Sequence, residues 1–196
     1  MTISVLQLDT VDSTNTWVAQ NSQTLPTGTI VYTLNQTSGR GRQGREWLSR
    51  PDEMLAFSVV MDCLPAGFNT TWVPLLAGVS LVESVRRLGV EGAVLKWPND
   101  VLVGGAKLAG ILVEVLPDSR LVVGTGINLR GTINSVPAPG AVSLAMEGVV
   151  VVEEVADVVR PATEALLQHV AGSSHLKPFL AHKAWKAIVE KYLTTI

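Results

Sequence analysis

The chain has 196 residues, of which 47% are hydrophobic and 16% are charged, and its formal net charge is −2. This length fits one domain with a sizeable core, and the slightly acidic balance argues against general binding to DNA or membrane surfaces. No apolar run reaches the roughly 18 residues of a membrane span, and the first residues lack a signal-peptide pattern. The single cysteine, Cys63, excludes an intramolecular disulfide and favours a reducing, cytoplasmic location.

Alternating and β-branched segments predict strands, and periodic segments bounded by caps and glycines predict helices. Strands are expected at residues 3–8, 29–34, 54–61, 93–96, 101–103, 107–115 and 121–129. Helices are expected from a cap at Asp12 or Ser13 to about residue 22, from residues 69–71 to 87, and over 151–170 and 176–192. Strands in quick succession, with helices early and late, favour an α+β fold. The expected fold is a mixed, mainly antiparallel sheet with helices packed mostly on one face.

The sequence also predicts a turn, a loop and the positions of the three histidines. Gly104 and Gly105 predict a tight hairpin turn. Residues 131–140 are rich in proline, glycine and serine and are expected to form an exposed loop. His169, His175 and His182 have no spacing suited to a metal site and are expected as surface or rim residues.

The most informative stretch, residues 38–50, alternates glycines with arginines ahead of a tryptophan. Its candidate functional residues are Gly39, Arg40, Gly41, Arg42, Gly44, Arg45 and Trp47. Glycines let successive N–H groups turn toward one anion, and arginines add forked donors that match carboxylates and phosphates. The stretch therefore predicts a site for a phosphate-bearing anion, with Trp47 as a flat surface for a base; the alternative is a solvated, flexible basic loop.

The glycine spacing of this stretch also matches the dinucleotide-binding fingerprint, but its surroundings do not. That fingerprint follows a strand directly and opens a helix. Here residues 35–38 separate the loop from the preceding strand, and Pro51 follows instead of a helix. A dinucleotide site of this type is therefore not expected.

Three further stretches place polar groups beside an apolar, glycine-lined surface. Residues 96–100 (Lys-Trp-Pro-Asn-Asp) end a strand at a polar cluster, for which a turn held by an Asx hydrogen bond is the alternative. Lys107 begins an apolar strand that contains Gly110. This arrangement suits a flat ligand that lies over Gly110 with its polar end at the Lys107 ammonium. The alternative is a snorkelling lysine, whose aliphatic stem is buried while its ammonium reaches solvent. Residues 124–129 repeat this theme with two glycines and Asn128.

Together these stretches resemble biotin protein ligase, also called biotin–acetyl-CoA-carboxylase ligase. The resemblance covers residues 13–129 and is highly specific in order and spacing. It is carried by Ser13-Thr14-Asn15, Gln36, residues 39–47, residues 96–100, residues 107–114 and residues 124–129. Taken alone, Ser13-Thr14-Asn15 would be interpreted as a helix cap.

The resemblance implies a two-step ligase that uses biotin and MgATP. Biotin and ATP would give biotinyl-5′-AMP and pyrophosphate, and a lysine of a biotin carboxyl carrier domain would then take the biotinyl group. Mg²⁺ would arrive on the nucleotide phosphates, so no metal site of the protein's own is expected. Neither nucleic acid nor membrane is an implied partner, and a homodimer is left open.

The resemblance also implies roles for individual residues. Catalytic roles fall to Lys107, Arg40 and Asp100, with Asp100 orienting or deprotonating the incoming lysine. Biotin binding is implied for Ser13, Thr14, Asn15, Gln36, Arg40, Gly41, Arg42, Lys107 and Gly110. Nucleotide binding is implied for Arg42, Arg45, Trp47, Asn99 and Asn128. The loop at residues 39–47 would close over the reactive adenylate and be mobile without ligand.

Two accessory domains of the family have no counterpart in these 196 residues: the N-terminal winged-helix DNA-binding domain and the C-terminal SH3-like domain. The expectation is one catalytic domain over residues 1–196 that is not a repressor. Two alternative functions stay open at this point. One is a lipoate or octanoyl ligase, which shares the fold, and the other is a non-catalytic binder of biotin or nucleotide.

Overall fold

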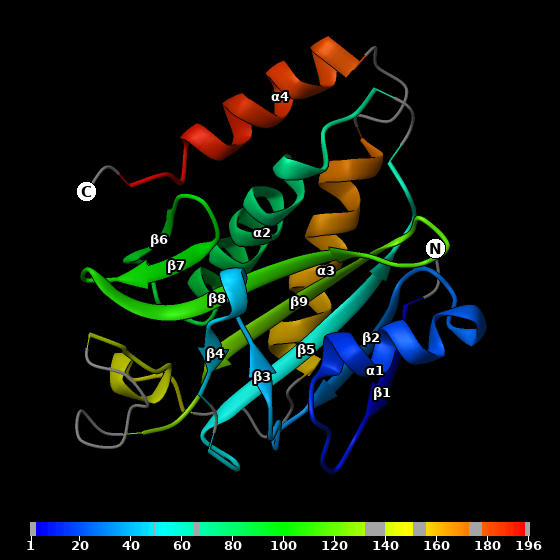
Figure 1. The fold of residues 1–196 in the computed structure, drawn as a ribbon. Helices are drawn as coiled ribbons and strands as arrows, with labels where there is room; N and C mark the ends of the chain where they lie inside the picture. Colours follow the sequence, from blue (N-terminus) through cyan, green and yellow to red (C-terminus); the bar gives the residue numbers. More distant parts are fainter. Residues whose placement is uncertain are drawn as a thin grey trace.

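The computed structural model describes residues 3–48, 50–64, 67–131, 140–150, 156–172 and 178–194. Its centre is a seven-stranded sheet in the order β1-β2-β5-β9-β8-β7-β6 (Figure 1). The strands are β1 (Ser4–Gln7), β2 (Thr29–Thr33), β5 (Met54–Met61), β6 (Ala93–Lys96), β7 (Asp100–Val103), β8 (Ala106–Val115) and β9 (Leu121–Asn128). Only β1 and β2 pair in parallel among these strands, so the predicted mixed, mainly antiparallel sheet is confirmed.

The two faces of the sheet carry different helices. Helices α2 (Val73–Arg87) and α3 (Ala156–Ala171) pack on one face, and α1 (Thr14–Asn21) packs on the other. Helix α4 (Pro178–Glu190) packs against α2, outside the sheet. Because side chains alternate along a strand, Val59 of β5 joins the α2 side and its neighbour Val60 joins the α1 side.

Capping residues, prolines and glycines in the sequence predict most ends of the helices and strands correctly. Ser13 caps α1, its side chain accepting a hydrogen bond from the N–H of Thr16. Pro74 lies in the first turn of α2, and Gly89 follows the helix with φ of 97°, a conformation that favours glycine. The predicted helix starts at residues 151 and 176, and most of the predicted loop at 131–140, lie outside the described residues.

The arginine-rich stretch is more regular than the sequence indicated. Strand β3 (Gly39–Arg40) pairs antiparallel with β4 (Glu46–Trp47), and the N–H of Gly41 donates to the carbonyl of Arg45 at 2.7 Å. We call residues 39–47 the arginine ribbon. It lies over the sheet on the face that carries α1 (Figure 1).

His169 and His182 are half-buried at the rim of the helix packing, in line with the expectation of surface or rim positions. His182 of α4 stacks on Trp72, and its Nε2 accepts the N–H of Asn69 at 3.0 Å. His169 Nε2 lies 3.5 Å from a carboxylate oxygen of Glu83 in α2. These contacts join α4 and α3 to α2 and the segment before it, a tertiary arrangement that spacing along the sequence does not reveal. His175 lies outside the described residues.

No helix in the described part of the chain is long and apolar enough to span a membrane.

Arg120, in the turn between β8 and β9, ties that turn to the segment after α1. Its guanidinium donates to the carbonyl of Leu25 at 2.7 Å, to the carbonyl of Ser22, and to Asp118 at 2.8 Å. The hydrogen bond from Arg120 lowers the pKa of Asp118, so this contribution to stability is present above the ordinary pKa of 3.8 and is lost as the pH falls through the lowered value.

We therefore expect Arg120→Ala to lower the free energy of unfolding by about 1–3 kcal/mol, because carbonyls that it satisfies lose a charged donor. Urea unfolding at neutral pH measures this loss. Arg87→Ala, at an exposed position at the end of α2, is the matched control and should change the stability by less than about 0.5 kcal/mol. Equal stabilities of the two variants would contradict the role assigned to Arg120.

Candidate active site

A cavity of about 300 Å³ lies between the arginine ribbon, α1 and the sheet. Every residue to which the family resemblance assigns a role lines this cavity, although these residues are spread from position 13 to position 128. They are Ser13, Thr14, Asn15, Gln36, Arg40, Gly41, Arg42, Arg45, Trp47, Asn99, Asp100, Lys107, Gly110 and Asn128. Gly39 and Gly44 border only the larger cavity described below. The fold thus brings the separate motifs to one place.

The floor of the cavity is a pair of glycines on adjacent strands. Gly110 of β8 and Gly126 of β9 are register partners. The indole of Trp47 lies over both: a Cβ atom would lie 2.9 Å from the ring at Gly110 and 2.5 Å from it at Gly126. Lys107 Nζ lies 5.1 Å from the centre of the same ring, within the range of a cation–π contact. In this structure the Trp47 side chain occupies the place over Gly110 that the sequence assigns to a flat ligand.

The Nε1 atom of Trp47 is buried and has no hydrogen-bond partner among the described residues. A buried N–H donor without an acceptor is unfavourable. The indole is therefore suited either to donate to a bound molecule or to move when one enters.

One end of the cavity is lined by neutral polar groups, beside which Arg40 and Glu114 form an ion pair. The N–H of Thr14 donates to Gln36 Oε1 at 3.0 Å. Ser58 Oγ lies 2.8 Å from Thr14 Oγ1 and 2.7 Å from Asn15 Oδ1. Asn15 Nδ2 donates to the carbonyl of Leu112 at 3.2 Å and to Glu114 at 2.8 Å. Both amide hydrogens of Asn15 are thus used within the protein, which makes this side chain an organiser of the site.

The other end of the cavity is charged. Lys107 Nζ lies 2.7 Å from Asp100 Oδ1 across the β7–β8 pair. Asn128 donates both amide hydrogens to backbone carbonyls, of Lys107 at 3.1 Å and of Val142 at 2.9 Å. This buried amide therefore holds the start of β8 to the segment around residue 142. An ammonium and a carboxylate at one end, and neutral donors and acceptors at the other, suit a molecule with an anionic tail and a neutral polar head.

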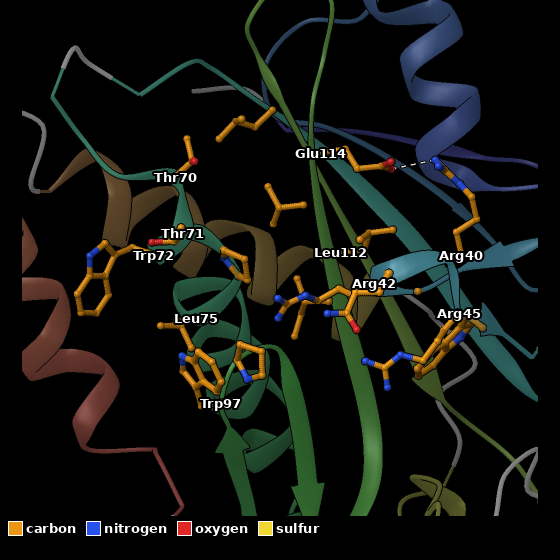
Figure 2. Close-up of a pocket in the computed structure, with 18 of the residues that line it drawn as sticks. Arg40, Arg42, Arg45, Thr70, Thr71, Trp72, Leu75, Trp97, Leu112 and Glu114 are labelled. Carbon is orange, nitrogen blue, oxygen red and sulfur yellow. Dashed lines mark hydrogen bonds and ion pairs between the residues drawn. The ribbon is translucent and has the colours of Figure 1, made fainter.

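The arginines of the ribbon border a second, larger cavity of about 1550 Å³. Figure 2 shows Arg40, Arg42 and Arg45 along one side of it and Thr70, Thr71 and Trp72 along the other. Arg42 donates to Asn99 Oδ1 at a long 3.4 Å. Both cavities are lined by the ribbon and by Ile111 and Leu112, so they adjoin. Trp97, with 66% of its surface exposed, lines the larger one.

Two residues of the site were not singled out from the sequence. Ser58 is fully buried in β5 and links Thr14 to Asn15. A lone hydroxyl inside the apolar run of residues 55–60 was the available signal. Glu114 lies in the motif at residues 107–114, which predicts no role for it, and it binds both Asn15 and Arg40.

Among the described residues, no group of three or more His, Cys, Asp or Glu side chains could hold a metal ion.

Comparison with known proteins agrees with this site. The model of the biotin/lipoate A/B protein ligase family matches residues 8–131. The biotin–[acetyl-CoA-carboxylase] ligase of Mycobacterium tuberculosis is 40% identical over 128 residues, which are 62% of this chain and 47% of that protein. The bifunctional ligase/repressor BirA of Escherichia coli is 33% identical over 152 residues, which are 74% of this chain and 47% of that protein. This chain therefore spans about half the length of these two curated relatives.

Solved structures extend the similarity to nearly the whole chain. The biotin protein ligase of Aquifex aeolicus, in complex with biotin and ATP, superposes with a TM-score of 0.79 and 28% identity. The superposition covers 97% of this chain and 78% of that one. The matched family model includes Lys107, Asp100 and the whole arginine ribbon. The chain belongs to the biotin/lipoate A/B protein ligase family.

Proposed function

We propose that this chain is a biotin protein ligase that consumes biotin and MgATP. A carboxylate oxygen of biotin attacks the α-phosphorus of ATP, and pyrophosphate leaves. The ε-amine of a lysine on a biotin carboxyl carrier domain then attacks the acyl carbon of biotinyl-5′-AMP, and AMP leaves. We assign this reaction to residues 1–196 acting as one catalytic domain.

One observation carries the proposal: the cavity has opposite chemical characters at its two ends. The uncharged network of Thr14, Asn15, Gln36 and Ser58 suits the ureido head of biotin, whose N–H and C=O groups need neutral partners. The glycine pair accepts a flat, apolar body, and the indole of Trp47 that lies there would have to move for biotin to occupy this place. Lys107, held by Asp100, lies where the carboxylate tail would end. The ligands in the similar Aquifex structure, biotin and ATP, have these properties.

The charged residues have separate tasks in this mechanism. The first step brings a carboxylate to a triphosphate, so two anions must approach each other. Lys107 would stabilise the charge shared between the carboxylate and the α-phosphate, and Arg42 and Arg45 would offset the remaining repulsion. A catalytic role was expected for Arg40 as well, but its guanidinium pairs with Glu114 at the other end of the cavity. Asp100 orients Lys107 in the first step and, as we propose, helps to deprotonate the acceptor lysine in the second.

The adenylate is a reactive acyl phosphate that water must not reach. The arginine ribbon already lies over the cavity, and Trp47 closes it against the glycine floor. We propose that Trp47 moves to stack on adenine when the nucleotide binds, with Asn99 and Asn128 nearby. The acceptor would approach through the larger cavity, which adjoins the first.

Transfer of labelled biotin to a purified biotin carboxyl carrier domain, with MgATP, tests the activity. Biotin-dependent release of pyrophosphate in the same reactions reports the first step alone. The absence of both biotin transfer and pyrophosphate release would contradict the proposal. Tight biotin binding without pyrophosphate release would indicate a non-catalytic binder. Parallel reactions with lipoate and octanoate separate this function from that of the lipoate branch of the family.

The ribbon should become protected when both substrates bind, because they order it over the site. Trypsin cleaves after arginine, so we expect biotin plus MgATP to slow cleavage at Arg40, Arg42 and Arg45. The expected slowing is roughly 10- to 100-fold at ligand concentrations of about 10 to 100 times the dissociation constant. Mass spectrometry of the fragments measures it. Cleavage at Arg87, an exposed arginine far along the chain, serves as the internal reference. Equal cleavage of the ribbon with and without substrates would contradict closure.

A further inference from the structure

Glu114 lies near the end of β8, beyond the cavity floor on the side opposite to Lys107, and it borders the larger cavity. Gly110, Leu112 and Glu114 alternate along β8, so they share the face of the sheet that carries the site. A single carboxylate oxygen of Glu114, Oε2, accepts two hydrogen bonds. It lies 2.9 Å from Arg40 Nη2 and 2.8 Å from Asn15 Nδ2. Figure 2 shows Arg40 turned toward this carboxylate.

The two donors come from different parts of the fold. Arg40 belongs to β3 of the arginine ribbon, and Asn15 belongs to α1, so ribbon, helix and sheet meet at one oxygen. The ribbon has two other contacts with the floor of the site. Trp47 packs on the glycines, and Arg42 donates to Asn99 at 3.4 Å. The bond to Glu114 is shorter and joins two charged groups, which makes it a stronger tether than the bond from Arg42 to a neutral amide.

Asn15 shows why an acceptor is needed at position 114. Its side chain is nearly fully buried, and its Nδ2 group has two hydrogens, one of which goes to the carbonyl of Leu112. Glu114 takes the second. A glutamine could still accept this hydrogen, but its neutral amide would lose most of the attraction to Arg40. The substitution Glu114→Gln therefore separates the two functions of the carboxylate.

We propose that Glu114 is a positioning residue: its carboxylate holds Arg40, and with it the arginine ribbon, closed over the end of the cavity where Asn15 organises the polar network. The expected consequence of this tether, tighter biotin binding, rests on the proposed function. The tether itself is a property of the ligand-free protein. Glu114 thus couples the order of the ribbon to the biotin head-group end of the site.

The first test is trypsin cleavage after Arg42 in the ligand-free protein. Glu114→Gln should accelerate this cleavage roughly 3- to 10-fold, the range expected for loss of a partly exposed, charge-assisted pair. Glu91→Gln removes an exposed carboxylate elsewhere and is the matched control, with cleavage at the wild-type rate. Thermal unfolding of the same samples should give midpoints within about 2 °C of each other, because the tether acts on a surface ribbon.

The second test is biotin-dependent exchange of pyrophosphate with ATP. Glu114→Gln should raise the half-saturating biotin concentration roughly 3- to 10-fold while kcat at saturating biotin changes less than about twofold. Arg40→Gln and the double variant that carries both Glu114→Gln and Arg40→Gln complete a double-mutant cycle. If the pair is the tether, adding Glu114→Gln to Arg40→Gln changes neither the cleavage rate nor the half-saturation further.

The outcomes are distinct. Strictly additive effects in the cycle, or wild-type cleavage of Glu114→Gln, overturn the inference, because Glu114 would then act on Asn15 alone or not at all. If the wild type shows no biotin-dependent exchange, the proposed function fails. The cleavage cycle on the ligand-free protein then still decides whether Glu114 tethers the ribbon.

Discussion

Lys107→Ala is expected to reduce both biotin-dependent pyrophosphate release and transfer of biotin to the carrier domain by roughly 10²- to 10³-fold. The ammonium lies 2.7 Å from Asp100 and faces the ring of Trp47, at the end of the cavity where the biotin carboxylate and the α-phosphate would react. Charge develops at that point in the transition state, and alanine provides no donor there. The loss should fall mainly on kcat, since the neutral head-group network remains.

Lys183→Ala is the matched control, because this exposed lysine of α4 does not line either cavity. Its activity should equal that of the wild type. Supplying preformed biotinyl-5′-AMP to Lys107→Ala separates the two steps. Substantial recovery of transfer would place Lys107 in adenylate formation, and no recovery would give it a role in both steps. Activity of Lys107→Ala within about threefold of the wild type would refute the catalytic assignment.

Gly124→Ala should weaken biotin binding about 10- to 100-fold, the cost of displacing a buried, hydrogen-bonded network. A Cβ atom at Gly124 would collide with the amide of Asn15, lying 2.8 Å from its Cγ and 2.9 Å from its Nδ2. Asn15 has little freedom to yield, because Ser58, Leu112 and Glu114 hold it on three sides. Overpacking of this kind should also lower the free energy of unfolding by about 1–3 kcal/mol.

The half-saturating biotin concentration in pyrophosphate exchange and the urea unfolding midpoint measure these two effects. Gly92→Ala is the control: its Cβ atom would lie 3.7 Å from Val103 Cγ1, an ordinary contact. That variant should keep wild-type biotin binding. Normal biotin binding by Gly124→Ala would mean that the position of Asn15 does not matter to the site.

Much of the fold follows from local patterns in the sequence. The strands at β5, β8 and β9 and the helix α2 are long and strongly patterned, and proline and glycine mark their ends. The hairpin at Gly104 and Gly105 is an example: both residues adopt positive φ, of 56° and 82°, as a tight turn requires. These features depend on residues close together in the chain, so they could be predicted.

Part of the grouping around the cavity also follows from local patterns, because residues 96–100 end one strand and Lys107 opens another. Ser13-Thr14-Asn15, at the start of α1, was assigned to the same site only through the family resemblance. The internal connections of the site do not follow from local patterns. Asn15 and Glu114 are 99 residues apart, and Arg40 and Glu114 are 74 apart. The folding of residues 39–47 into a paired ribbon, and the placement of Trp47 on the glycine floor, depend on the same distant partners.

The sequence by itself determined the strands and helices, the mainly antiparallel architecture and the residue types that gather at the cavity. The tertiary structure alone decided which groups share hydrogen bonds: Ser58 between Thr14 and Asn15, and Glu114 between Asn15 and Arg40. The reason is physical. Secondary structure reflects backbone preferences and the periodicity of apolar residues over a few positions, whereas a hydrogen bond between distant side chains depends on how helix, ribbon and sheet pack together.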